Sequence, residues 1–153
     1  MITPAMADPI PLDDAAADSL RPALKLERFF PGRLKAKDAR LLFSHSGLYR
    51  YAPQEYVIHQ GEDTKDLHVV LRGSVAITKT LGTAGAHLAT LGPGDIFGEM
   101  ALVRDGRRVA NAIAASAALE FRLAYLDVQG LMAGNPELGE HLKSLAERRS
   151  GAG

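Results

Sequence analysis

A short segment of the chain combines residue types that can hold a phosphorylated sugar. Between residues 92 and 111 it contains Gly94, Gly98, Glu99 and, ten residues after Gly98, Arg108. Glycine adopts positive φ angles and lets a ligand approach the backbone closely. An arginine guanidinium can donate two parallel hydrogen bonds to one phosphate, whereas an ionised glutamate only accepts hydrogen bonds and therefore suits a sugar hydroxyl. The segment predicts a site for a phosphate beside a sugar.

The residues between Gly98 and Arg108 add to this prediction. Met100-Ala101-Leu102 is an apolar run that predicts one helical turn. The first N–H groups of a helical turn have no partner within it and attract an anion. Arg107 is predicted to face solvent, because successive side chains of an extended segment point in opposite directions.

Motifs before and after this segment complete a family resemblance. Residues 97–102 (Phe-Gly-Glu-Met-Ala-Leu) and then Arg108-Val109-Ala110 form the first motif, residues 55–62 and 67–77 form a strand, turn, strand and Gly-Ser-Val pattern, and residues 135–138 open a leucine-rich run. The set resembles the cyclic nucleotide-binding domains of protein kinase A regulatory subunits, catabolite activator protein and cyclic nucleotide-gated channels. The first motif looks like the phosphate-binding cassette of that family.

The resemblance implies a role for each residue of the first motif. Arg108 is expected to bind the exocyclic oxygens of a cyclic phosphate, and Glu99 to accept a hydrogen bond from the ribose 2′-hydroxyl. Backbone N–H groups near Met100, Ala101 and Ala110 are expected to complete the phosphate site. The ligand-binding residues expected in this way are Phe97, Gly98, Glu99, Met100, Ala101, Arg108, Val109 and Ala110.

The base of the nucleotide is expected to lie on apolar side chains. Members of the family often carry serine, threonine or alanine where this chain has Val109, and a hydroxyl there is associated with binding guanine. Because valine cannot make that hydrogen bond, cyclic AMP is favoured over cyclic GMP as the ligand. Val75 and Val109 are expected to contact the base, with Leu142 or Leu145 from the last helix as a lid.

Hydrophobic periodicity predicts the elements that position this site. Leucines and phenylalanines recur every three to four residues over 24–30 and 37–48, which predicts two short helices. From Tyr49 onward the period changes to two in short runs bounded by glycine, which is typical of an all-β sandwich or barrel. Together with the resemblance, this predicts a mainly β fold, an eight-stranded jelly-roll-like β-barrel with N-terminal helices and C-terminal lid helices.

The predicted C-terminal helices follow from capping residues. Asp127 is a candidate helix N-cap and Gly134 a candidate stop, after which Asn135 and Pro136 start the final helix. Gly130 to Gly134 is the predicted hinge between the two helices, and Leu138, Leu142 and Leu145 fall on one face of the second.

Composition sets the domain organisation. The chain has 153 residues, enough for one domain with a conventional core. Residues 1–22 carry prolines and acidic but few basic side chains and are predicted to be a flexible tail. Residues 23–149 are predicted to form the cyclic nucleotide-binding domain, and residues 150–153 a disordered end.

Charge and hydropathy narrow the function classes. The formal net charge is zero and there is no cysteine, so neither nucleic-acid binding nor thiol chemistry is expected. No apolar run approaches the ~20 residues that span a bilayer, and the acidic N-terminus lacks the features of a secretory signal. We expect a cytoplasmic protein without a membrane segment.

The resemblance implies a sensor, not an enzyme, with a cyclic nucleotide as ligand and neither cofactor nor metal. The movement of the C-terminal helices would be its output, passed to a protein partner or effector domain that the sequence does not identify; nor does the sequence give an oligomeric state. Two alternatives remain open: a degenerate barrel that serves as an interaction scaffold without binding nucleotide, and a cupin-like metal enzyme. The five histidines raise the second, although the His-x-His pattern of cupins does not occur.

Overall fold

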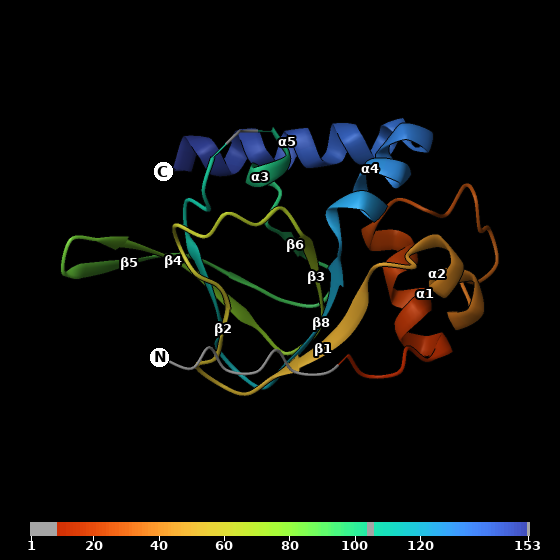
Figure 1. The fold of residues 1–153 in the computed structure, drawn as a ribbon, viewed down its shortest axis with the longest axis horizontal. Coiled ribbons are helices and arrows are strands. Elements are labelled where there is room, and N and C mark those ends of the chain that lie inside the picture. The colour runs from red at the N-terminus through yellow and green to blue at the C-terminus, as the bar shows by residue number, and fades with distance from the viewer. Residues whose placement is uncertain (1–8, 104–105, 153) are drawn as a thin grey trace.

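The computed structural model describes residues 9–103 and 106–152, and within them eight strands form two antiparallel four-stranded sheets (Figure 1). One sheet has the order β1-β8-β3-β6 and the other the order β2-β7-β4-β5. The strands are β1 (Gly47–Tyr51), β2 (Tyr56–Ile58), β3 (Leu67–Arg72), β4 (Val75–Leu81), β5 (Ala84–Leu91), β6 (Ile96–Phe97), β7 (Asn111–Ala114) and β8 (Ala118–Leu123). This arrangement confirms the predicted mainly β fold.

Helices flank the sheets at both ends of the chain and once within it. They are α1 (Asp14–Ala23), α2 (Ala36–Leu42), α3 (Met100–Val103), α4 (Tyr125–Gly134) and α5 (Pro136–Ala152). The helical turn predicted at residues 100–102 is confirmed as α3. None of the helices within the described residues is long and apolar enough to cross a membrane.

The β4–β5 hairpin closes on a tight turn. Leu81 pairs with Ala84 across two intervening residues. Gly82 has a φ of +65° at the first central position of this turn, where glycine supports the tight turns that match strand twist. The hairpin consequently projects from the body of the protein (Figure 1).

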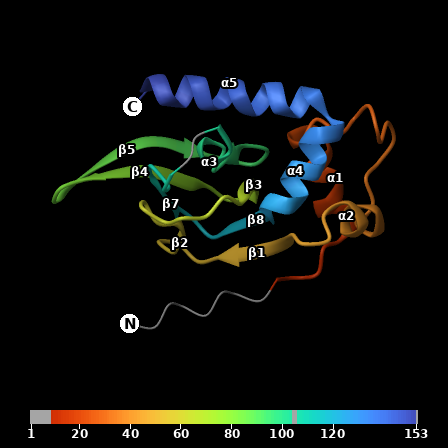
Figure 2. The same cartoon turned by 45° about the horizontal axis from the view of Figure 1, so that its top comes forward.

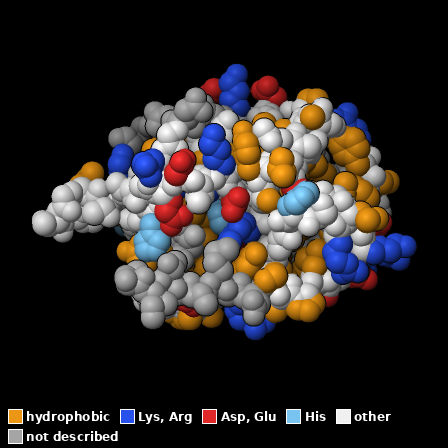
Figure 3. Space-filling view, viewed as in Figure 1, with side chains coloured by type: hydrophobic (Ala, Val, Ile, Leu, Met, Phe, Trp, Pro, Cys, Tyr) orange, Lys and Arg blue, Asp and Glu red, His pale blue; other side chains and the backbone are white. Residues whose placement is uncertain are grey.

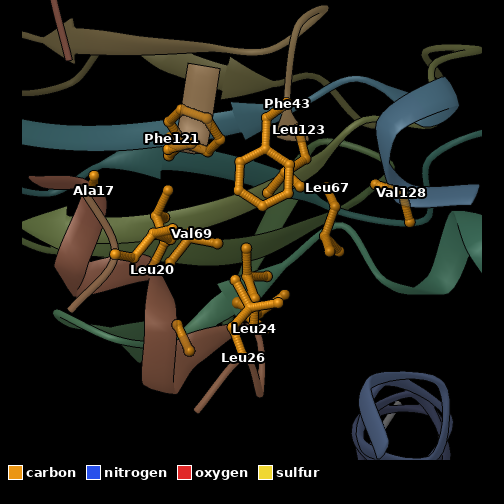
Figure 4. Close-up of a cluster of buried hydrophobic side chains, with 14 of the residues drawn as sticks. Ala17, Leu20, Leu24, Leu26, Phe43, Leu67, Val69, Phe121, Leu123 and Val128 are labelled. Carbon is orange, nitrogen blue, oxygen red and sulfur yellow. The ribbon is translucent and has the colours of Figure 1, made fainter. Parts of the chain in front are cut away.

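Two hydrophobic clusters lie on opposite faces of the sheet β1-β8-β3-β6. Neighbouring residues of β3 separate into them: Val69 belongs to the cluster shared with the helices, and Val70 to the cluster between the two sheets. Figure 4 shows the first cluster, in which the rings of Phe43 and Phe121 meet edge to face at 5.7 Å. Because both faces are buried, this sheet forms a rigid wall behind the site.

The N-terminal part of the chain differs from the predicted tail. Residues 1–8 lie outside the described residues, but α1 is an integral helix whose Ala17 and Leu20 are fully buried against the sheet. Its acidic residues have structural roles. Asp13 caps the helix by accepting from the N–H of Ala16 at 2.8 Å, and Asp18 accepts from the N–H of Leu34 at 2.9 Å. The apolar spacing of α1, masked by neighbouring prolines, explains the difference.

The next segment also departs from the prediction of two helices. Residues 24–30 form turns, with Lys25 at a φ of +56°, and the side chain of Asn135 donates to the carbonyls of Leu24 and Lys25 at 3.2 and 2.9 Å. The second predicted helix, over residues 37–48, is shorter than expected: α2 ends at Leu42, and β1 already starts at Gly47. Long-range partners, rather than local periodicity, decide both conformations.

The boundary between the two C-terminal helices lies where it was predicted, but the predicted N-cap of the first helix is wrong. The stop at Gly134 and the start at Pro136 are confirmed. Asp127, however, is buried within the first turn of α4, and its carboxylate accepts from the N–H of His45 at 2.9 Å and from Ser46 Oγ at 2.6 Å. α5 continues to Ala152, so the predicted disordered end is helical over residues 150–152, and Gly153 lies outside the described residues.

α5 lies along one side of the barrel beside α3, as Figures 1 and 2 both show. Leu138, Leu142 and Ala146 face inward and are buried, while Leu145 is partly buried. The outward residues of the helix are charged or polar, which is the pattern of a surface helix. The predicted apolar face of this helix is therefore confirmed.

If α1 is part of the folded domain, Leu20→Ala should destabilise it by about 2–5 kcal/mol, the usual cost of emptying a fully buried leucine site. Ser19→Ala is the matched control, because Ser19 lies on the exposed face of the same helix. Urea unfolding of both variants measures the difference. Equal free energies of unfolding for the two variants would show that residues 14–23 are not packed as described.

Candidate functional site

A cavity of about 510 Å³ opens between the sheet β2-β7-β4-β5, the final helix and the site segment, by which we mean residues 97–103 and 106–110. All eight residues predicted to bind the ligand line it: Phe97, Gly98, Glu99, Met100, Ala101, Arg108, Val109 and Ala110. The remaining lining residues are Ile58, Ile77, Lys79, Leu88, Gly106, Arg107, Asn111, Ala112 and Arg149. Residues predicted from one stretch of sequence thus share one cavity.

The guanidinium of Arg108 is the most unusual group in the cavity. The residue is only 7% exposed, and its three nitrogens donate to Thr64 Oγ1 at 2.9 Å, to the carbonyl of Gly98 at 3.0 Å and to the carbonyl of Asp66 at 2.8 Å. All three acceptors are neutral oxygens. Because a guanidinium carries five N–H donors, two are left without a partner among the described residues.

Burial and nearby carboxylates have opposite effects on this group. Desolvation lowers the pKa of Arg108 from its ordinary value, whereas the charges of Asp66, Glu62 and Glu99 raise it. An arginine remains protonated in proteins despite such shifts. The cavity therefore contains a buried positive charge whose direct hydrogen-bond partners are uncharged.

The backbone around Arg108 is held by the turn that follows β2. The N–H of Gly61 donates to the carbonyl of Arg108, and the N–H of Arg108 donates to the carbonyl of Glu62, both at 2.8 Å. Arg107 is exposed, as predicted, and its Nη1 donates to the carbonyl of Gly61 at 3.1 Å. The adjacent arginines therefore differ in environment, one at the rim of the cavity and one inside it.

Gly98 permits the close approach of the guanidinium. Its φ is +90°, and a Cβ placed there would lie 2.9 Å from Nη1 of Arg108 and 2.9 Å from the carbonyl oxygen of Asp66. Both the backbone angle and the space exclude a side chain. The glycine was predicted from its type, but its contact with Arg108 required the structure.

Phe97 forms the wall behind this glycine. Its ring stacks on the imidazole of His68, with centroids 4.8 Å apart, and His68 Nδ1 lies 2.8 Å from Glu120 Oε2. His68 and Glu120 are both buried. This hydrogen-bonded pair fixes the ring that supports the first residues of the site segment.

Glu99 has a partner that the sequence did not reveal. It is 2% exposed, and its Oε2 accepts from Nη1 of Arg149 on α5 at 2.7 Å. The same nitrogen donates to the carbonyl of Ile96 at 2.7 Å. The sequence places two adjacent arginines, Arg148 and Arg149, near the end of the final helix. No local pattern indicates that Arg149 contacts Glu99, about 50 positions earlier in the chain.

The residues expected to contact the base lie in different places. Val109 lines the cavity and is 39% exposed. Val75 is fully buried between the sheets, and Leu142 and Leu145 belong to the cluster shared with α1. None of these three lines the cavity: Val75 and Leu142 are buried in the core, and the partly buried Leu145 packs against it.

Other strands supply apolar cavity residues that the sequence analysis missed. Ile77 on β4 and Leu88 on β5 line the cavity, as does Lys79, two residues after Ile77. The alternation of strand side chains places Ile77 and Lys79 on one face of β4. This alternation is the feature of the sequence that could have identified both as cavity residues. The cavity thus combines apolar strands with an Arg-rich edge.

The arrangement suits an anionic ligand with an apolar part. Among the described residues, four cationic side chains line the cavity, Lys79, Arg107, Arg108 and Arg149, against one carboxylate, that of Glu99. Over residues 9–103 and 106–152, no group of three or more His, Asp or Glu side chains is placed to hold a metal ion. The cupin-like alternative therefore gains no support from the described part of the chain.

Comparison with known sequences identifies one family. The family model described as cyclic nucleotide-binding domain matches residues 48–135. The chain is 32% identical over 117 residues to the cyclic AMP receptor protein of Thermus thermophilus, covering 76% of this chain and 54% of that protein. It is 31% identical over 108 residues to the cAMP-activated global transcriptional regulator CRP of Salmonella typhimurium, covering 69% and 51%. The chain spans about half the length of these curated relatives.

Solved structures share the fold. The crystal structure of the Thermus thermophilus catabolite activator protein matches with a TM-score of 0.65 at 32% identity, covering 74% of this chain and 54% of that chain. The regulatory domain of Toxoplasma gondii PKA, co-crystallised with cAMP, matches with a TM-score of 0.69 at 22% identity, covering 88% and 50%. Because the identity of the second match is only 22%, this match shows a shared fold and nothing more.

Substituting Gly98 should be more damaging than substituting a glycine with the same backbone angle. Gly94 has a φ of +91° and open space around its Cα, so Gly94→Ala should cost about 1–3 kcal/mol from backbone strain alone. Gly98→Ala adds the clash with Arg108 and Asp66 and should cost at least about 1 kcal/mol more. Chemical unfolding of both variants measures this. A Gly98→Ala variant as stable as Gly94→Ala would contradict the close packing of Arg108.

Proposed function

Because the chain belongs to the cyclic nucleotide-binding domain family, we propose that it binds a cyclic nucleotide in the cavity beside Arg108 and reports binding through its C-terminal helices. The observation that carries the proposal is the buried guanidinium with neutral partners. A buried charge that is hydrogen-bonded only to neutral groups is costly. A cyclic phosphate would supply a charged partner and accept hydrogen bonds from the two remaining N–H groups.

The sugar and phosphate have assigned neighbours in this proposal. Glu99 accepts a hydrogen bond from the ribose 2′-hydroxyl, and the backbone N–H groups of Met100, Ala101 and Ala110 complete the phosphate site. All four residues line the same cavity as Arg108, which supports the assignment.

Cyclic AMP is the proposed ligand, and cyclic GMP the weaker one. The base lies against Ile77, Leu88 and Val109, which are apolar lining residues. Valine at 109 offers guanine no hydroxyl, so the valine removes one contact that would favour cyclic GMP. The curated relatives named for cyclic AMP support the same preference.

The proposed role is that of a regulator without catalytic activity, acting in the cytoplasm. A ligand shifts a helix only if it binds the two helix positions with different affinity, and α5 borders the cavity through Arg149. A protein partner or effector domain would receive the movement. The curated relatives named as regulators are about twice as long as the part aligned here.

Nucleic-acid binding is not part of the proposal. The formal net charge of the chain is zero. On the face shown in Figure 3, Lys and Arg side chains are interspersed with Asp and Glu. Such a distribution gives little non-specific attraction to a phosphate backbone.

Arg108→Ala should weaken cyclic AMP binding at least about tenfold, because a hydrogen bond to a charged group contributes ~1.5–3 kcal/mol. Arg108→Lys should recover only part of the affinity, since an ammonium cannot form the two parallel bonds. Calorimetric titration measures both, after unfolding curves show that the variants are folded. Arg107→Ala is the matched control at the exposed neighbour and should bind nearly normally.

Equal affinity in the wild type and both Arg108 variants would refute the role of Arg108 in binding the phosphate. A folded wild type that binds no nucleotide would favour the scaffold alternative.

Val109→Thr should improve cyclic GMP binding relative to cyclic AMP, because it adds a hydroxyl that guanine can use. One hydrogen bond of about 0.5–1.5 kcal/mol corresponds to roughly a twofold to tenfold change in the ratio of affinities. Competition titrations with the two nucleotides provide the ratio. Val109→Ala controls for loss of the valine side chain, and the same ratio in both variants would remove residue 109 from base recognition.

A further inference from the structure

A buried pair of ionisable side chains lies behind the phosphate end of the cavity. His68 on β3 is paired in the sheet with Phe97 on β6, and its Nδ1 lies 2.8 Å from Oε2 of Glu120 on β8. The side chains of His68 and Glu120 are 3% and 0% exposed. An apolar pair would fill this interior position at lower desolvation cost, and the proposed ligand contacts involve neither residue.

The imidazole of His68 presents its other edge to the site segment. A Cβ placed on Gly98 would lie 3.4 Å from Cδ2 of His68, and the carbonyl of Gly98 accepts from Arg108. Nε2, which is covalently bonded to Cδ2, has no hydrogen-bond partner among the residues that the structure describes. One glycine therefore separates this ring from the guanidinium proposed to bind the phosphate.

The pair of His68 and Glu120 can hold one proton or two. The first proton lies between Nδ1 and Oε2, which leaves the pair with a net negative charge. A second proton on Nε2 makes the pair neutral. Histidine is the side chain that ordinarily gains a proton between about pH 8 and about pH 6.

Charged and phenolic groups from several elements surround the pair. They are Arg122 on β8, Tyr49 and Tyr51 on β1, Asp66 before β3 and Arg108 in the site segment. Both arginines stay protonated in this range. Burial raises the pKa of Tyr51 to about 12, and the charge of Glu120 adds to the increase, so this phenol stays neutral. His68 is thus the group of this cluster suited to change its charge.

We propose that His68 and Glu120 form a proton-linked support of the site, on which an anionic ligand binds more tightly when the pair carries its second proton. This inference rests on the proposed cyclic nucleotide function. A phosphate beside Arg108 and a negatively charged pair behind Gly98 repel each other, and the second proton removes this repulsion. Binding is therefore coupled to proton uptake, and the affinity rises as the pH falls.

The test is calorimetric titration with cyclic AMP at about pH 6 and about pH 8, in buffers that differ in their enthalpy of ionisation. The charge of the cyclic phosphate does not change in this range, so a proton taken up on binding comes to the protein. We expect the wild type to bind at least about threefold more tightly at the lower pH. The dependence of the binding enthalpy on the buffer should show proton uptake.

Two substitutions of His68 each keep one of its structural contacts and remove its titration. His68→Asn keeps an amide donor near the position of Nδ1, and His68→Phe keeps a ring that can stack on Phe97, as the imidazole does at 4.8 Å. After unfolding curves show which variants are folded, both should bind equally well at the two pH values and without proton uptake. A pH dependence of wild-type size in a folded variant would overturn the inference.

His141→Asn is the matched control at another partly buried histidine. Burial lowers the pKa of His141, and the charges of Lys25, Arg148 and Arg149 lower it further, so this imidazole stays mostly neutral in the range tested. The variant should keep the full pH dependence. Loss of the dependence in this variant would assign it to α5 and overturn the role of His68.

Glu120→Gln separates electrostatic support from a merely structural role. It removes the negative charge and keeps the size of the side chain, so at the higher pH it should bind cyclic AMP at least about threefold more tightly than the wild type. A structural role predicts weaker binding at both pH values, which would overturn the inference. Wild-type binding that is independent of pH would remove only this inference, whereas a folded wild type that binds no cyclic AMP at either pH would remove the proposed function itself.

Discussion

The buried guanidinium of Arg108 is the group on which the site depends. Its three hydrogen bonds to Thr64, Gly98 and Asp66 join segments that are far apart in the sequence. The fit requires glycine at 98, because a Cβ there would lie 2.9 Å from the guanidinium. Since the bonded partners are uncharged, the positive charge remains available for an anion, and this is what makes the cavity a candidate phosphate site.

The rest of the fold holds the parts around this charge. The sheet β1-β8-β3-β6 is buried on both faces, so β6 holds Phe97, and Gly98 directly after it, on a rigid support. α5 packs through Leu138 and Leu142 and reaches the cavity with Arg149. A helix anchored at one end in the core and at the other by an ion pair is well placed to respond to the site.

The sequence predicted the parts of the site that are close together along the chain. Gly98, Glu99 and Arg108 were identified because glycine, glutamate and arginine carry recognisable chemistry at a fixed spacing, and the family resemblance added their neighbours among residues 97–101 and 108–110. Contacts between distant segments were not predictable: Arg149 with Glu99, and Asp127 with the turn at His45 and Ser46. The segment of α1 was assigned to a flexible tail because its buried face includes small alanines among prolines and acids. Local pattern identifies residue types, whereas packing decides which of them meet.

The central claim is that phosphate recognition by Arg108 provides much of the binding free energy. The most direct test is calorimetric titration of the unmodified chain with cyclic AMP and with adenosine, which has the same base and ribose but no phosphate. We expect saturable binding of cyclic AMP and binding of adenosine at least about tenfold weaker, the value of a hydrogen bond to a charged group. Equal affinity for the two ligands, or no binding of cyclic AMP by the folded chain, would contradict the account.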